Sequence, residues 1–487
     1  MTAHSRRGFL GMTATAAALG LSPHRALAQP EGAGVGRVMS VLSTYMSAAR
    51  TRALSTEVIE QAKYHLLDSL AAVISGSELP PGQAAQRYIR EHGSSGGAIT
   101  VFGSALTAPP IDAALANGMM AHADETDDSH NESRSHPGCA VVPAALAVGE
   151  AYGIDGNLLL RAVTLGYDIG TRVVMAMGGA AFSYESSLAT HSIAGTFGAT
   201  AAAVCAAGLD ARQIRWALGY AAQESSGITA WRRDTDHIEK AFVFAGMPAR
   251  NGVTAALLVK SGWNGVDDIF SGPDNFFAAY APKAQPDRLI EKLGERYEIT
   301  QTDIKKWPVG SPIQAPLDAI EVIRSKRAFE ADQVRKVTVR LAPSVANVVD
   351  NRDIPDICLQ HMMAVMLVDK TVSFHAAHDK PRMQESAILK QRAKVNLVRD
   401  DELAKLLPVR ETVVDVELQD GTRLSERVSA VRGTSRNPMT RDEVIAKARD
   451  LTAPVLGRDT STRLIETILE LEKVTEVRNL RRLLQRG

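Results

Sequence analysis

The chain has 487 residues, of which 45% are hydrophobic, so it can bury a large core and form two or three domains. Its 55 lysines and arginines balance 55 aspartates and glutamates, and we therefore expect no bulk attraction to nucleic acid or to an anionic membrane. The three cysteines, Cys139, Cys205 and Cys358, lie far apart and include no C-x-x-C run, which argues against a disulfide framework and against an iron–sulfur dehydratase.

The first 28 residues have the features of an export signal. Residues 5–10 read SRRGFL, a short apolar run covers residues 11–21, and Ala26-Leu27-Ala28 forms a small-residue cleavage site. The apolar run is too short to span a bilayer, and we find no later run of about 20 apolar residues. We therefore interpret residues 1–28 as a twin-arginine signal peptide, cleaved after Ala28, and expect a periplasmic protein that is free of the membrane once the signal is removed.

Residues 37–300 are predicted to form the first part of a helical domain. Ser55 is predicted to cap a helix that Gly76 ends. Further helices are predicted over residues 111–121, 141–152, 157–177, 191–207, 211–224 and 248–261. Pro143 is expected near the start of the second of these, and Asp210 is expected to cap the fifth. The high content of alanine and glycine indicates close helix-on-helix packing.

Residues 301–435 are predicted to form a smaller α+β domain. A helix near residues 316–326 precedes a strand in which Val337, Val339 and Leu341 alternate with polar residues. A second alternating run at residues 414–418 ends at Asp420-Gly421, a typical hairpin turn. Residues 436–487 are predicted to return to the helical domain, with a capping box at Thr440-x-x-Glu443 and a long helix over residues 460–485.

The segment from residue 121 to residue 138, AHADETDDSHNESRSHPG, contains more titratable groups than folding requires. Carboxylates held close together raise at least one pKa, and imidazoles titrate near neutral pH, so this segment is suited to acid–base chemistry. A polar run between helices is usually a solvated loop, but two apolar helices flank this one. The titratable residues are His122, Asp124, Glu125, Asp127, Asp128, His130, Glu132, Arg134 and His136.

Three other stretches contain residues that could meet this segment. His191 precedes an alanine- and glycine-rich helix, where a histidine is often a cap or a core residue. Lys305 and Lys306 lie at the expected domain boundary, where pockets are common, although paired lysines are often just a solvated surface. The third stretch, which follows Trp231, includes Arg232, Arg233, His237, Lys240 and Arg250.

These residues resemble the MmgE/PrpD family. The family's H-A-x-D-x-D-D-T-H segment and the following H-P-G match residues 122–130 and 136–138, and the likeness continues through GYDIGTRV and AGTFGATAAA to residues near 451. The resemblance implies a mainly α fold, with a large all-helical domain and a smaller α+β lid domain. It also implies a homodimer, a site between lid and helices without a cofactor or a metal, and small di- or tricarboxylate substrates.

The resemblance also implies which residues form the site. In this sequence Glu125 and Ser129 replace the motif's first aspartate and its threonine, while Val243-Phe244, Gly310 and Gln314 stand where the family has histidine or cysteine. We expect His136 or His191 to be the base or acid, Lys240 and Lys305 to hold carboxylates, and the acidic residues to set their pKa values. The expected catalytic residues are Glu125, Ser129, His136, His191, Lys240 and Lys305, and the expected substrate-binding residues are Asp127, Asp128, His130 and Arg250.

The favoured hypothesis is a lyase that hydrates, dehydrates or decarboxylates a small polycarboxylate after proton abstraction next to a carboxylate. An isomerase or epimerase of an amino- or hydroxy-dicarboxylate is the nearest alternative. A periplasmic carboxylate-binding protein without catalysis is another. A metal-dependent hydrolase is also considered, with ligands among His122, Asp127, Asp128, His130 and His136. Export favours a substrate taken from the environment.

Overall fold

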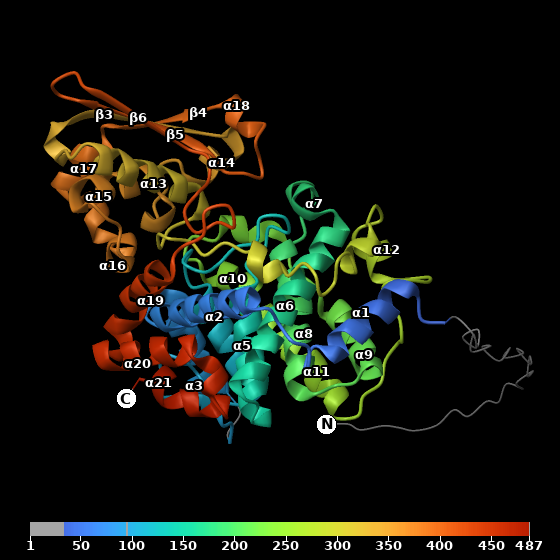
Figure 1. Cartoon of the computed structure of the whole chain (residues 1–487). Coiled ribbons are helices and arrows are strands. Elements are labelled where there is room, and N and C mark those ends of the chain that lie inside the picture. The colour runs from blue at the N-terminus through green and yellow to red at the C-terminus, as the bar shows by residue number, and fades with distance from the viewer. Residues whose placement is uncertain (1–33, 94–95, 487) are drawn as a thin grey trace, which may run out of the picture. The chain divides into compact units, whose positions relative to one another are not determined.

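The computed structural model describes residues 34–93 and 96–486, so the predicted signal peptide lies outside the described residues (Figure 1). Residues from Val35 onward form one compact unit. Helices make up 61% of the structure and strands 8%, which confirms a mainly α fold with a smaller α+β domain.

The helical domain begins with α1 to α4, which precede the acidic segment, and continues with α5 to α12 after it. Two short strands, β1 (Ile99–Thr100) and β2 (Thr107–Ala108), lie between α3 and α4. The helices are α1 (Arg37–Ala48), α2 (Thr56–Gly76), α3 (Pro80–His92), α4 (Pro110–Ala121), α5 (Gly138–Tyr152), α6 (Gly156–Met177), α7 (Gly179–Glu185), α8 (Thr190–Ala207), α9 (Ala211–Glu224), α10 (Ile238–Ala241), α11 (Met247–Lys260) and α12 (Phe276–Tyr280).

Local sequence signals set most of these boundaries. The Ser55 side chain accepts a hydrogen bond from the backbone of Val58 at the start of α2, and Asp210 forms a capping box with Gln213 at α9, as predicted. The expected start of α5 near Pro143 is wrong, because the helix already begins at Gly138. Pro143 lies inside α5, where its missing N–H removes one hydrogen bond of the helix.

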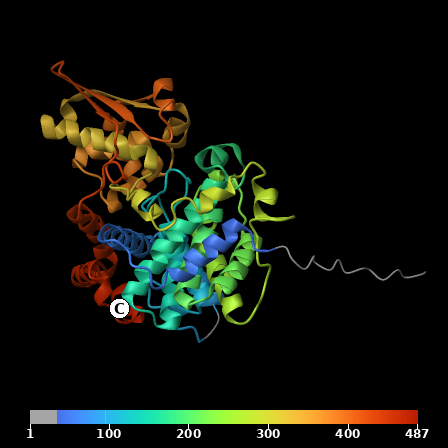
Figure 2. The same cartoon turned by 45° about the vertical axis from the view of Figure 1, so that its right-hand side comes forward.

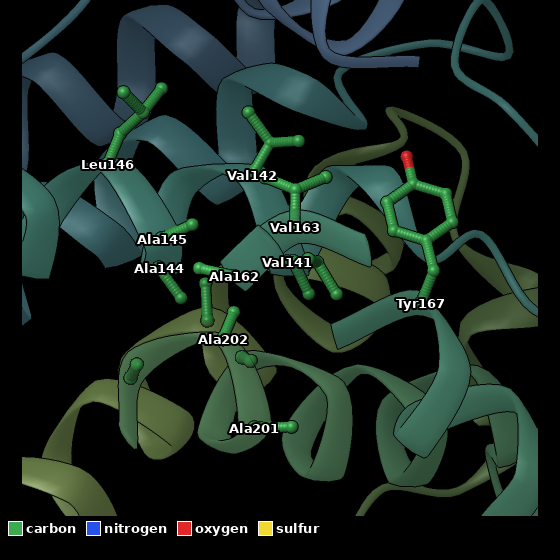
Figure 3. Close-up of a cluster of buried hydrophobic side chains, with 14 of the residues drawn as sticks. Val141, Val142, Ala144, Ala145, Leu146, Ala162, Val163, Tyr167, Ala201 and Ala202 are labelled. Carbon is green, nitrogen blue, oxygen red and sulfur yellow. The ribbon is translucent and has the colours of Figure 1, made fainter. Parts of the chain in front are cut away.

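Small residues allow α5, α6 and α8 to pack closely in the core. Figure 3 shows valines and alanines of α5, with Ala162 and Val163 of α6, facing Ala201 and Ala202 of α8. A Cβ atom at Gly170 of α6 would lie 2.3 Å from the carbonyl oxygen of Ala194 in α8, so the contact requires glycine. The predicted close packing of the helices is confirmed.

The apolar run Ile238–Lys260, which comprises α10, the π-helical segment η2 (Phe242–Gly246) and α11, also belongs to the core. It is long and apolar enough to cross a membrane, although no such run was predicted after the signal peptide. However, 72% of its most apolar window is buried inside the protein, as is usual for a core helix.

The α+β domain is built on a four-stranded sheet of order β4-β3-β5-β6. Strand β3 (Val334–Leu341) pairs in parallel with β4 (Val395–Arg399) and antiparallel with β5 (Thr412–Leu418), which forms a hairpin with β6 (Arg423–Val428). Figures 1 and 2 agree in placing α13 (Ser311–Lys326) and α15 (Leu359–Asp369) against one face of the sheet. The domain also contains α14 (Pro343–Val349), α16 (Phe374–His378), α17 (Ser386–Arg392) and α18 (Asp401–Ala404).

The chain then forms α19 (Arg441–Leu456), with the predicted capping box at Thr440, followed by α20 (Arg458–Leu469) and α21 (Arg481–Leu484). The prediction of one helix over residues 460–485 is wrong. After α20 the backbone bonds to the turn between α5 and α6 instead, where Gly156 N donates to Val474 O at 2.8 Å. A tertiary contact therefore overrides the apolar periodicity.

Candidate active site

The acidic segment between α4 and α5 is buried, as its apolar flanks predict. The side chains of His122, Asp127 and Asp128 are 0% exposed. Burial of charged groups costs several kcal/mol unless partners compensate, so the contacts within the segment decide what it can do.

Asp127 lies between two imidazoles and one ammonium group. Its carboxylate oxygens are 2.9 Å from Nδ1 of His122 and 3.1 Å from Nδ1 of His136, and Nζ of Lys305 is 3.6 Å away. Burial alone would raise the pKa of Asp127, but His122, His136 and Lys305 hold it well below its usual value. An ionised Asp127 fixes the Nδ1–H tautomer of His136 and leaves its Nε2 for another partner.

Glu125 is the second carboxylate that lysines neutralise. Lys240 of α10 donates to Oε1 of Glu125, and Lys305 donates to the backbone oxygen of Glu125 at 2.7 Å. Although burial raises the pKa of Glu125, the charges of Lys240 and Lys305 lower it well below the usual range. Glu125 thus holds the ammonium group of Lys240 at a fixed position.

An aromatic stack brings the histidines together. Phe244, in the π-helical segment η2, stacks on His191 at 3.9 Å between ring centroids and on His122 at 4.6 Å. Trp231, in the short helix η1 (Thr229–Arg233), meets the ring of His191 edge-on at 5.8 Å. Burial and nearby positive charge lower the pKa of His191 well below 6.5, and the pKa of His237 is lowered in the same way. These imidazoles are therefore neutral at neutral pH.

A cavity of about 530 Å³ opens onto this cluster from between the helical domain and the α+β domain. His136, His191, His237, Glu125 and Lys240 line it on the helical side. Ser129 and His130 also line it, and His130 is anchored by a contact of 3.3 Å between its Nε2 and Oε2 of Glu298.

Four arginines line the same cavity, and none of them has an ion-pair partner among residues 34–93 and 96–486. Arg134 has a positive φ of 47° and places its guanidinium 3.7 Å from the ring centroid of Tyr184. Arg232 follows Trp231, while Arg352 and Arg410 come from the α+β domain. Guanidinium groups without carboxylate partners provide binding sites for carboxylates of a ligand.

Some of the expected site residues do not reach the large cavity. Asp127 and Lys305 do not line it, but Asp127 contacts His136, which does. Asp128 is a structural residue that accepts hydrogen bonds from Tyr167 and from the backbone of Gly138. Arg250 donates to Asn251 on α11 at 3.0 Å, so this geometry does not support the expected contact of Arg250 with substrate.

A second contact from the α+β domain joins the acidic segment. Nε2 of His378 in α16 lies 2.9 Å from Oδ2 of Asp124. Burial opposes protonation of His378, but Asp124 and Asp356 outweigh it and raise the pKa of His378 from 6.5 to about 9. A buried ion pair therefore ties α16 to the segment that holds the site.

Several residues of this site were not predicted to have a role in it. His237 could have been found, because it precedes Lys240 by only three residues in the stretch that was expected to meet the acidic segment. Arg134 was noted only as part of the acidic segment. No sequence signal marked Arg352, Arg410 or His378, since their positions depend on how the two domains meet.

Two groups of side chains could offer ligands to a metal ion: His122 with Asp127 and His136, and His122 with Glu125 and His237. In each group a lysine ammonium already neutralises the carboxylate, Lys305 for Asp127 and Lys240 for Glu125. A divalent cation would have to displace or oppose that charge, so the donor set fits a metal poorly.

The chain is thus a mainly α protein with a buried cluster of titratable groups and a cationic cavity beside a small α+β domain. The chain belongs to the MmgE/PrpD family: the MmgE/PrpD N-terminal domain matches residues 40–289, and the MmgE/PrpD C-terminal domain matches residues 307–473. This confirms the family that the motifs indicated.

The chain is similar to several decarboxylases along most of its length. It is 25% identical to the cis-aconitate decarboxylase-like protein oryM of Aspergillus oryzae over 476 residues, which cover 91% of this chain and 96% of that protein. It is 27% identical to the cis-aconitate decarboxylase of Mus musculus over 458 residues (89% and 90%) and 26% identical to that of Homo sapiens over 455 residues (89% and 91%). The family and these relatives point to an enzyme of the lyase type.

Proposed function

We propose that the protein is a lyase that acts on a small di- or tricarboxylate, either by removing CO₂ or by adding or removing water, with the residues of the chain alone. The observation that carries this proposal is the cavity lined by four guanidinium groups, which have no ion-pair partner among residues 34–93 and 96–486, together with four imidazoles and Lys240. Several cations around a few acid–base groups suit a small molecule that carries several negative charges.

His136 is the base in this proposal. Burial lowers its pKa below 6.5, so the imidazole is neutral at neutral pH, and Asp127 orients it through Nδ1. Its Nε2 takes the proton from the carbon next to a carboxylate, and the electron pair spreads onto that carboxylate. The positive charges of Lys240 and the arginines stabilise the negative charge that develops there.

Lys240 is the acid. In dehydration the C–O bond breaks, and the leaving hydroxide takes a proton from the Lys240 ammonium and departs as water. In decarboxylation the C–C bond to one carboxylate breaks, CO₂ leaves with no proton, and the electron pair of that bond stays on the carbon skeleton. The skeleton then takes one proton from Lys240 and regains the proton that His136 had removed. The names of the relatives favour the second reaction for this chain.

Two further parts of the proposal concern the protein as a whole. The paired arginines and the small-residue site before Gln29 support export and cleavage after Ala28, hence action in the periplasm. The family resemblance supports a homodimer.

The experiment is an NMR assay of the mature protein, residues 29–487, with a panel of di- and tricarboxylates in D₂O. The proposal expects one of them to lose CO₂ or to gain or lose water, and H136Q to abolish that reaction. H92Q, which changes an exposed histidine at the end of α3, is the matched control and should leave the rate unchanged. Deuterium uptake into an otherwise unchanged compound would show an epimerase, and binding without any change would show a carboxylate receptor.

A further inference from the structure

The cavity has an apolar wall that carboxylate recognition does not explain. Val345, Val348 and Val349 of α14 line it, together with Ile354 and Ile357 of the following loop. Val348 is 50% exposed, although it belongs to a domain that buries most of its large apolar side chains. An exposed apolar surface inside a ligand cavity marks a place where an apolar part of the ligand binds.

The helical domain contributes aromatic rings to the same cavity. Tyr184, Trp231 and Phe244 line it, and Tyr184 is 46% exposed. The volume of about 530 Å³ lies within the range of about 300–1,000 Å³ that is usual for pockets that hold drug-sized molecules. A short carboxylate that bound the arginines and His136 would leave the exposed side chain of Val348 in contact with water, whereas Val345 and Val349 are buried by the protein itself.

Two of the arginines that line the cavity belong to the same domain as its apolar wall. Arg352 precedes Ile354 by two residues, and Arg410 of the same domain also lines the cavity. The α+β domain therefore offers both a charged and an apolar surface to one ligand. Such a surface is complementary to a molecule that has carboxylates at one end and a hydrocarbon group at the other.

We propose that the natural substrate is a polycarboxylate that carries an alkyl or aryl arm, and that the arm packs against Val348, Val345 and Ile354 while the carboxylates bind the arginines. This inference rests on the proposed function, since it assumes that the substrate binds in the same cavity. It adds that α14 determines specificity through the length and bulk of the arm.

The first test measures the dissociation constants of succinate, butylsuccinate and octylsuccinate, and of propane-1,2,3-tricarboxylate, by isothermal titration calorimetry on the mature protein. Burial of each methylene group of the arm is expected to tighten binding by about fourfold, until the wall is covered. Equal affinities along the alkyl series would overturn the inference but leave the proposed function intact. Failure of every acid to bind, including the tricarboxylate, would refute the proposed function and with it this inference.

The second test compares three variants that separate the wall from the charges. V348N should reduce the tightening of binding for each added methylene group to less than twofold. It should leave the dissociation constant of succinate within twofold of the wild-type value. R352M should weaken binding of all the acids by a similar factor and preserve the gain per methylene. V398N, which changes a valine of β4 that is 41% exposed and outside the cavity, should change neither quantity.

Circular dichroism and thermal unfolding of each variant check that it has folded. If V348N were folded and still showed the wild-type dependence on arm length, the arm would not bind at α14 and the inference would be wrong. The calorimetric series of ligands on the wild-type protein tests the inference independently of the variants. The inference therefore stays testable even if one variant fails to fold.

Discussion

Replacement of Asp127 by asparagine gives the sharpest test of the acid–base cluster. The carboxylate accepts from His122 at 2.9 Å and from His136 at 3.1 Å, and it faces Lys305 at 3.6 Å. Asparagine keeps the size but removes the charge, and its single amide oxygen can accept from only one of the two imidazoles, because its NH₂ group can only donate. A hydrogen bond to a charged group contributes about 1.5–3 kcal/mol, so we expect D127N to lose roughly 3 kcal/mol of unfolding free energy.

The effect on activity should be larger than the effect on stability suggests. Without Asp127 the base His136 is no longer held in the Nδ1–H tautomer, and the imidazolium that forms during the reaction loses its counter-charge. Because loss of a positioned acid–base group costs typically 10²–10⁴ in rate, we expect kcat to fall by about that factor.

The pH dependence distinguishes this role from a structural one. The negative charge of Asp127 raises the pKa of His136, in opposition to burial, which lowers it. Removal of the charge lowers the pKa further, so the acidic limb of the kcat/KM profile should move to lower pH. D128N is the matched control, because Asp128 is equally buried but bonds to His65, Tyr167 and Gly138 instead. It should cost similar stability and leave the acidic limb in place, and a D127N profile that coincides with the wild type would refute the reasoning.

Three further predictions follow from other parts of the site. H378Q should destabilise the protein by on the order of 3 kcal/mol at pH 6, because the fold raises the pKa of His378 from 6.5 to about 9. The stabilisation by protonated His378 is complete below pH 6.5 and is lost as the pH rises through 9. Urea unfolding should therefore show a smaller difference in unfolding free energy between wild type and H378Q at pH 10 than at pH 6. In steady-state assays K240M should lower kcat by about 10²–10⁴. K306M is the control, because it removes a similar lysine–glutamate pair, Lys306 with Glu321, outside the large cavity, and it should leave kcat unchanged. The exported protein should have a mass that corresponds to cleavage after Ala28, and substitution of both Arg6 and Arg7 by lysine should block export, as fractionation and mass spectrometry would show.

Much of the fold follows from local signals in the sequence. Ser55, Asp210 and Thr440 cap helices because their side chains can bond to backbone N–H groups two or three residues later, and this chemistry needs no tertiary information. Apolar and polar residues alternate along the strands β3 and β5 because one face of the sheet is buried and the other is more exposed. The parallel strand β4 was missed, since its exposed residues give no alternation and its pairing with β3 joins segments that are far apart in the sequence.

The site was predictable in part for the same reason. The density of charge in residues 121–138 marked the acidic segment, and motif order marked Lys240 and His191. What could not be predicted is which carboxylate faces which cation, because Lys305 reaches Glu125 across 180 positions of the chain. The roles of Arg352 and Arg410 depend on where the α+β domain meets the helices.

The positions where the family motif has histidine bear on whether this chain is an enzyme or only a receptor. Gln314 is a structural residue here, because its side chain bonds to the backbone of Trp307 and Val309, and Phe244 fills the space between two imidazoles. Neither change removes acid–base capacity, since His130, His136, His191 and His237 all line the cavity. A receptor for carboxylates would need only the arginines at the surface of the cavity. It would have no use for Asp127, a fully buried carboxylate whose desolvation costs several kcal/mol and whose contacts orient a neutral histidine toward the ligand. The retention of that costly arrangement favours catalysis over binding alone.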